Sequence, residues 1–150
     1  MMQIIQMDED YVVGLSVPDP EEMEELAAKG FRAVANLREA GEEKEYLSPR
    51  EEEEQARRND MEYVHTPVST DDLSEERVDE LREVLQQLPR PVLVHCKSGK
   101  RSGAFLLMHT ASERGQSGEE AVGQAESMGF RCENAEMEQF VTDYINRHNH

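Results

Sequence analysis

One stretch near the middle of the chain constrains the fold most, an apolar run that leads into a short loop of glycine, serine and cations. Residues 92–94 have the composition of a buried strand, and residues 104–108 have that of a buried helix. Between them lies His-Cys-Lys-Ser-Gly-Lys-Arg-Ser-Gly, residues 95–103. A strand that passes through a tight loop into a helix gathers backbone N–H groups, and the helix dipole there favours negative charge. The stretch therefore predicts an anion-binding loop in an α/β fold.

Cys96 is the first residue of this loop. A thiolate at this position is stabilised by the helix N-terminus and by the cations Lys97, Lys100 and Arg101. In the competing interpretation, Cys96 is a small buried hydrophobe, as single cysteines usually are. The glycine, arginine and serine that follow Cys96 favour a nucleophile held beside an oxyanion cradle.

Composition limits the classes of protein to which the chain can belong. Its 150 residues predict a single domain, 1–150, with one core. The formal net charge of −17 argues against nucleic acid or an anionic membrane as a partner. No apolar run reaches the roughly 18 residues of a membrane span, and the first residues lack the pattern of a secretion signal. We therefore expect a cytoplasmic protein, in which Cys96 and Cys132 form no disulfide.

The distribution of charge sets the loop apart from the rest of the chain. The acidic run 51–54 is interpreted as a solvated helix face. Against such a background the loop cations form a local positive site, which attracts a small anion while the global field opposes a highly charged one. The five histidines have no metal-ligand spacing, so we predict no metal and no cofactor.

Turn and capping signals predict strands and helices that alternate along the chain. Strands are expected at 4–5 and 11–13, as a hairpin, and at 31–37, 61–68 and 92–95. Helices are expected after the caps Asp19, Ser48, Ser74 and Ser117, from Ser102 to about Glu113, and over a last apolar face from Met137 to Ile145.

This alternation predicts an α/β fold with a mainly parallel central sheet flanked by helices. Ligands of such sheets bind beyond the carboxyl ends of the strands. We therefore expect Arg38, the loop that contains Asp71 and Asp72, and the Cys96 loop to lie at one edge of the sheet.

Residues 95–103 resemble the signature of the cysteine-dependent protein tyrosine and dual-specificity phosphatases, which is His-Cys, five residues, then Arg and Ser or Thr. Residues 20–37 and the acidic loop after them, including the run KGFRAVANLRE, are similar to a bacterial phosphatase-like family related to the N-terminal domain of beta-lactamase-hydrolase-like proteins. The segment GQSGEEAVGQAESMGF also suits that family. The resemblance covers most of residues 12–147 and implies a tyrosine-phosphatase-like fold.

The resemblance also implies roles for the residues of the loop. Cys96 would attack phosphorus, Arg101 would hold two phosphate oxygens as a planar fork, and Ser102 would donate to the departing sulfur. His95 would lie behind the loop, orient it and help to keep the thiol ionised. The remaining residues expected to bind substrate are Lys97, Ser98, Gly99, Lys100 and Arg38.

A phosphatase of this kind also needs a general acid, which the family places as an aspartate on a loop ahead of the signature. Asp71 and Asp72 are the two candidates, and Asp71 is preferred. The competing interpretation of both is turn chemistry ahead of the helix cap Ser74. The expected substrate is a phosphorylated protein or a small phosphate ester, hydrolysed through a phosphocysteine.

One difference from the signature leaves a second reaction open. Four residues separate Cys96 from Arg101, where the phosphatase signature has five. The shorter spacing is that of rhodanese-like sulfurtransferases, in which Cys96 would carry a persulfide taken from a sulfane-sulfur donor. Cys132 would then be either a resolving thiol or a structural cysteine. A third hypothesis, a phosphate-recognition module without turnover, is disfavoured by the complete set of His95, Cys96, Arg101 and Ser102.

Overall fold

The computed structural model describes residues 2–39, 47–69 and 73–149. The strands are β1 (Ile4–Gln6), β2 (Tyr11–Gly14), β3 (Ala33–Asn36), β4 (Glu62–His65) and β5 (Val92–His95). The helices are α1 (Pro20–Ala28), α2 (Pro49–Arg58), α3 (Glu75–Gln86), α4 (Lys100–Arg114), α5 (Gly118–Ser127) and α6 (Ala135–His148). None of these helices is long and apolar enough to cross a membrane.

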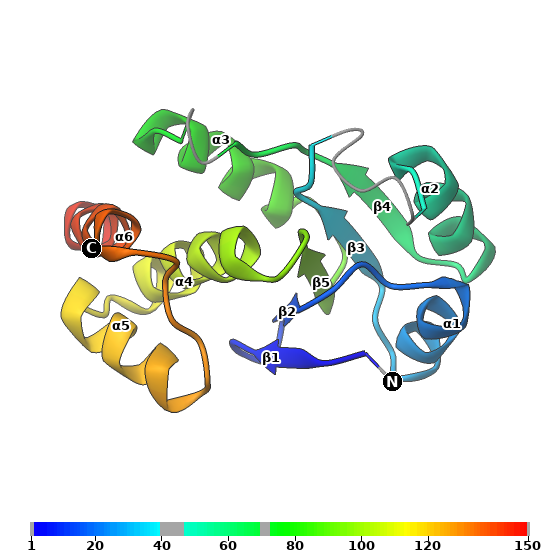
Figure 1. Ribbon diagram of the computed structural model, residues 1–150, viewed down its shortest axis with the longest axis horizontal. Coiled ribbons are helices and arrows are strands. Elements are labelled where there is room, and N and C mark those ends of the chain that lie inside the picture. Colours follow the sequence, from blue (N-terminus) through cyan, green and yellow to red (C-terminus); the bar gives the residue numbers. More distant parts are fainter. Residues whose placement is uncertain (1, 40–46, 70–72, 150) are drawn as a thin grey trace.

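The strands form one sheet in the order β1-β2-β5-β3-β4, with β5 in the centre. β1 pairs antiparallel with β2, and the other pairs are parallel. Alternate strand residues face opposite sides, so Val12, Val34 and Leu93 pack with α1 and α2, whereas Val13 and Val94 pack with α3 to α6. Figure 1 shows the two groups of helices on opposite sides of the strands. The predicted α/β fold with a mainly parallel sheet is confirmed.

Local sequence signals account for where the helices begin. The side chain of Asp19 accepts a hydrogen bond from the backbone N–H of Glu22, and the Glu22 side chain accepts one from the backbone N–H of Asp19. Ser48 makes the same reciprocal pair with Glu51 at the start of α2. These boxes satisfy N–H groups that the first turn leaves without helical partners. Both predicted capping boxes are confirmed.

The strand register brings the carboxyl ends of four strands into one row. Gly14 of β2 and Asn36 of β3 are both paired with His95, and Asn36 is also paired with His65 of β4. The backbone N–H of Leu37 then donates to the carbonyl of His95 over 2.8 Å. The segments that follow β2, β3, β4 and β5 therefore leave the sheet at the same edge, as predicted for Arg38 and the Cys96 loop.

Candidate active site

Cys96 leaves β5 at the centre of this edge and opens the loop into α4. Its side chain is only 1% exposed, whereas Lys97, Ser98 and Lys100 are exposed and Arg101 is half-buried. The sulfur therefore lies at the base of a loop whose cations face solvent.

Gly99 gives the loop its shape. Its φ of 91° lies in the left-handed region, which glycine adopts without strain. A Cβ at this position would come within 2.6 Å of Cδ2 of Leu15, so the loop also packs tightly against the end of β2. Because Gly99 is the residue before α4, the helix begins at Lys100, two residues earlier than the sequence predicts.

The N-terminus of α4 is the part of the loop best suited to an anion. α1, α2, α3, α5 and α6 each begin with a side chain that accepts a hydrogen bond from the first turn. Over the residues that the structure describes, α4 has no such capping side chain, because Gly99 stands in that position. The first turn of α4 thus keeps the N–H polarity that a bound oxyanion would satisfy.

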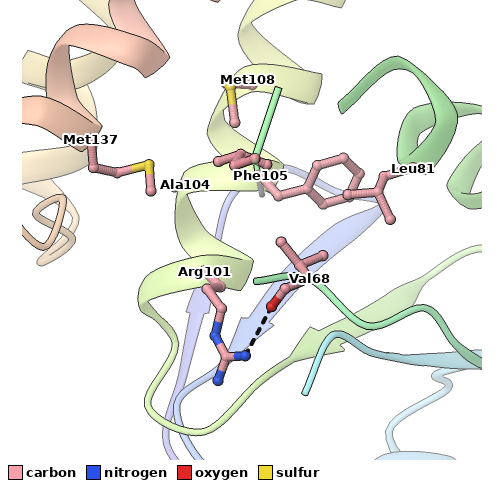
Figure 2. Close-up of a pocket in the computed structure, with 8 residues that line it drawn as sticks. Val68, Leu81, Arg101, Ala104, Phe105, Met108 and Met137 are labelled. Carbon is pink, nitrogen blue, oxygen red and sulfur yellow. Dashed lines mark hydrogen bonds between the residues drawn. The ribbon is translucent and has the colours of Figure 1, made fainter. Parts of the chain in front are cut away.

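Arg101 lies in this first turn and contacts the segment that follows β4. Its Nη1 donates to the carbonyl of Val68 over 3.1 Å (Figure 2). Figure 2 also shows the aliphatic part of Arg101 at the end of a narrow apolar pocket lined by Phe105, Met108 and Met137. The guanidinium is thereby held beside the chain that runs toward Asp71. Asp71 and Asp72 themselves lie outside the described residues.

Ser102 is the next residue of α4, and its side chain is fully buried. Its hydroxyl has no hydrogen-bond partner among the residues that the structure describes. A buried hydroxyl without a partner costs about 1–3 kcal/mol, so such groups are rare and call for an explanation. The predicted donation from Ser102 to the sulfur of Cys96 is one explanation, and it stays a prediction.

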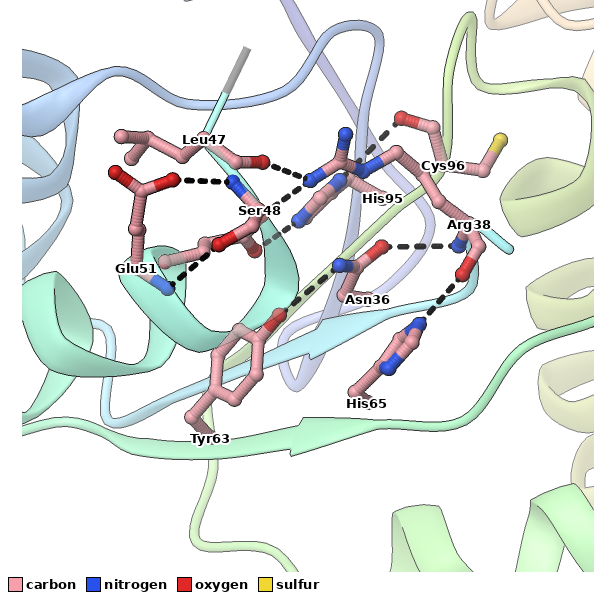
Figure 3. Close-up of polar contacts among 10 residues, drawn as sticks. Asn36, Arg38, Leu47, Ser48, Glu51, Tyr63, His65, His95 and Cys96 are labelled. Carbon is pink, nitrogen blue, oxygen red and sulfur yellow. Dashed lines mark hydrogen bonds and ion pairs between the residues drawn. The ribbon is translucent and has the colours of Figure 1, made fainter. Parts of the chain in front are cut away.

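His95 is fully buried behind the loop, as expected. Its Nδ1 lies 3.3 Å from the carbonyl oxygen of Cys96 (Figure 3). Its Nε2 contacts a carboxylate oxygen of Glu52, on α2. The histidine therefore connects the backbone of the nucleophile to a helix on one face of the sheet.

Glu52 corrects the interpretation of residues 51–54 as a solvated helix face. Its side chain is completely buried and contacts His95 with one carboxylate oxygen and Arg38 with the other, at 3.3 Å. Glu53, the next residue, is exposed and pairs with Arg57. The signal in the sequence is the helical spacing between Glu52 and Ala56, which is the other buried residue of α2.

The prediction that Arg38 binds substrate is not met in this structure. Its side chain is 2% exposed, and its Nη2 donates to the carbonyl of Leu47 over 2.6 Å and to Glu52. Arg38 does follow β3 at the predicted edge of the sheet. Its guanidinium, however, is used to neutralise a buried carboxylate, which would otherwise be very unfavourable.

Further polar residues of β3 and β4 enclose this cluster (Figure 3). Nδ2 of Asn36 donates to the hydroxyl of Tyr63 over 2.9 Å, and Oδ1 of Asn36 accepts from the backbone N–H of Arg38. His65 Nε2 lies 2.6 Å from the carbonyl of Arg38. Burial, and next the charge of Glu52, raise the pKa of Tyr63 above its usual value, so its hydroxyl stays protonated.

The second cysteine, Cys132, is half-buried near the other side of the loop. Lys100 donates to the carbonyl of Arg131 over 2.8 Å and lies above the ring of Phe130, so this segment borders the loop. Burial, and next the charge of Glu138, raise the pKa of Cys132 to about 11. A thiol that stays protonated at neutral pH is a poor resolving nucleophile. Among the described residues, no cluster of His, Cys, Asp and Glu is arranged to hold a metal ion.

Comparison with known sequences identifies relatives of most of the chain. The family model described as "Beta-lactamase hydrolase-like protein, phosphatase-like domain" matches residues 4–112. A beta-lactamase hydrolase-like protein of Xylella fastidiosa is 30% identical over 112 residues, which are 75% of this chain and 25% of that protein. The chain therefore spans about a quarter of the length of this relative.

Comparison with solved structures extends the likeness of fold to nearly the whole chain. A structure from Neisseria meningitidis, described as a candidate phosphatase, has a TM-score of 0.79 at 20% identity and covers 94% of this chain and 97% of its own. TpbA of P. aeruginosa, solved in complex with pTyr, has a TM-score of 0.74 at 17% identity and covers 97% and 89%. These likenesses establish a phosphatase fold.

Proposed function

Since the chain belongs to the family of beta-lactamase hydrolase-like, phosphatase-like domains, we propose that it hydrolyses phosphate monoesters through a phosphocysteine on Cys96. The observation that carries the proposal is the position of this thiol. Cys96 stands at the base of a cationic loop that leads, three residues later, into a helix N-terminus without a capping side chain in the described structure. A thiolate and a doubly charged phosphoryl group are both stabilised by such a field.

The reaction proceeds in two displacements. In the first, the Cys96 thiolate attacks phosphorus, the S–P bond forms, and the P–O bond to the leaving group breaks while Asp71 gives that oxygen a proton. In the second, Asp71 takes a proton from water, the oxygen of water attacks phosphorus, and the S–P bond breaks. Arg101 and the N–H groups of the loop hold the non-reacting oxygens, and Ser102 donates to the departing sulfur.

The contact between Arg101 and Val68 supports Asp71 as the acid. Asp71 follows Val68 by three residues, and each residue spans at most about 3.6 Å. Asp71 is thus close in the sequence to the segment that Arg101 contacts, and this closeness is the support for giving it the role of the acid. Asp72 has nearly the same reach and is the alternative.

Phosphotyrosine in a peptide of low negative charge is the substrate class that we favour. The solved structure of TpbA with pTyr supplies the analogy. A cysteine that is only 1% exposed, at the base of a loop, also favours a phosphoryl group carried on an extended arm, such as an aryl ring. Because the net charge is −17, the field of the whole protein disfavours substrates with many phosphates.

The length of the loop favours one alternative, sulfur transfer. Only four residues separate Cys96 from Arg101, one fewer than in the phosphatase signature. The loop N–H groups and Arg101 therefore enclose a smaller space. In this alternative, the Cys96 thiolate attacks the outer sulfur of thiosulfate, a new S–S bond forms, and sulfite leaves. An acceptor thiolate then attacks the outer sulfur of the persulfide and releases Cys96.

One pair of assays distinguishes these hypotheses. The same preparation is tested with 4-nitrophenyl phosphate and with thiosulfate plus a thiol acceptor, next to Cys96→Ser and the matched control Cys132→Ser. We expect phosphate release by the unmodified chain and by Cys132→Ser, and none by Cys96→Ser. Sulfur transfer without phosphate release would favour the alternative, and binding of phosphate without either reaction would indicate a recognition module. Phosphate release by Cys96→Ser at the unmodified rate would refute both enzyme hypotheses.

A further inference from the structure

We propose that Glu52 is a positioning residue, which lies ionised between Arg38 and His95 and holds the His95 ring doubly protonated behind Cys96. The proposal rests on Cys96 being the reactive thiol of the proposed function. It concerns the ionisation of that thiol, so it is tested without any substrate.

The hydrogen bonds of His95 require a proton on each ring nitrogen. A carbonyl oxygen only accepts, so Nδ1, at 3.3 Å from the carbonyl of Cys96, must donate. An ionised carboxylate also only accepts, so Nε2 must donate to Glu52. A ring that donates from both nitrogens is an imidazolium.

Arg38 is the reason that Glu52 is ionised. Its guanidinium is always charged in proteins, and its Nη2 lies 3.3 Å from Oε1 of Glu52. Both side chains are removed from water, at 2% and 0% exposure. A neutral Glu52 would leave a buried guanidinium without a counter-charge, which is far more costly than an ionised pair.

The groups that face this cluster from β3 and β4 do not cancel its charge. Tyr63 stays neutral, because burial raises its pKa, and Asn36 is uncharged. His65 contacts the carbonyl of Arg38. Two cations and one carboxylate therefore leave one net positive charge behind the loop, in a chain whose total charge is −17.

This charge acts on the adjacent thiol. Since His95 precedes Cys96 and contacts its carbonyl, an imidazolium there stabilises the thiolate. In Glu52→Gln the shape is kept, but the imidazolium loses its counter-charge and faces the guanidinium of Arg38. The ring should then release a proton, and thiolate formation should require a higher pH.

The test is the rate of Cys96 alkylation by iodoacetamide as a function of pH, measured in a Cys132→Ser background. Glu52→Gln should raise the midpoint of the profile by about one pH unit, the lower end of the effect of a nearby opposite charge. Glu53→Gln is the matched control, because it removes the same charge from an exposed position on the same helix. The pH profile of Cys96 alkylation in Glu53→Gln should have the same midpoint as in the Cys132→Ser protein without a further substitution. Equal midpoints for Glu52→Gln and Glu53→Gln would overturn the proposal.

Because Glu52→Gln breaks a buried ion pair, a second measurement uses the protein without that substitution. Nitrogen-15 spectra of the histidine rings distinguish an imidazolium from either neutral tautomer, and the signal that disappears in His95→Asn assigns His95. We expect the imidazolium pattern at about pH 7.5, above the usual titration of histidine near 6.5. A neutral His95 ring at that pH would refute the proposal even if Cys96 proves to be the catalytic nucleophile.

Discussion

His109 provides a prediction about stability, because it is a fully buried histidine on the helix that starts at the Cys96 loop. Nε of Arg82 donates to its Nδ1 over 3.0 Å, so that nitrogen carries no proton and the ring is neutral. Burial lowers the pKa of His109 from 6.5 to about 4, opposed by the charge of Glu113 and assisted by Arg82. The unfolded chain therefore takes up a proton at His109 that the folded chain refuses.

The sign and size of the effect follow from these two values. Between pH 6.5 and about pH 4 the unfolded state binds more protons, so the free energy of unfolding falls as the pH falls. Above pH 6.5 both states are neutral at His109, and the contribution to stability is fully present. When the pH falls from about 7.5 to about 5, this difference in the pKa of His109 between the folded and unfolded states lowers the free energy of unfolding by roughly 2 kcal/mol.

Urea unfolding at these two pH values measures the loss. Other groups also titrate in this range, so the informative quantity is the difference in pH dependence between the unmodified chain and His109→Gln. We expect His109→Gln to lose about 2 kcal/mol less than the unmodified chain over this interval. His148→Gln, at the end of α6, is the control with the same number of histidines. If the unmodified chain and His109→Gln lose the same free energy, a neutral buried His109 is refuted.

Three further predictions concern the site and its helix. Asp71→Asn should slow the hydrolysis of esters with poor leaving groups much more than that of activated aryl esters, and equal losses in kcat would exclude Asp71 as the acid. One glycine inserted after Lys100 should lower phosphatase activity on the order of a hundredfold, since a shift of about 1 Å misplaces Arg101 relative to Cys96. If the insertion instead raises phosphate hydrolysis and abolishes sulfur transfer, the sulfurtransferase alternative is favoured. Gly103→Ala would put a Cβ 2.1 Å from Cε1 of Phe130 and should destabilise the fold by about 1–3 kcal/mol in urea unfolding. Gly123→Ala is its control, because a Cβ there meets nothing within 4 Å and alanine favours the helix, so stability should hold or rise.

Features that depend on a few neighbouring residues were predictable from the sequence. The caps at Asp19 and Ser48 follow from side chains that satisfy backbone groups three residues away. The ends of the strands are predicted less accurately from the sequence, because a strand extends only as far as the neighbouring strand with which it pairs. The strand predicted over 61–68 is Glu62–His65, since β3, its neighbour in the sheet, ends at Asn36.

The pairing of the sheet explains why the loop was predictable and the residues that support it were not. Residues 95–103 are contiguous, so their order alone indicates a strand, a loop and a helix N-terminus. Arg38, Glu52 and His95 come from three separate elements and meet only because β3 pairs with β5, with Asn36 opposite His95.

Among the four glutamates 51–54, the burial of Glu52 likewise depends on residues that are distant in the sequence. Identical residues in a row show no preferred face, and only the phase of the helix distinguishes them. Ser48 fixes that phase as the N-cap, and Ala56, the one small apolar residue of α2, marks the side that packs on the sheet. Glu52 lies one turn before Ala56 and is buried with it. The spacing to Ala56 indicates the side of the helix, but an acidic residue on that side needs a cation from elsewhere in the fold, so the sequence of α2 alone does not predict that Glu52 is buried.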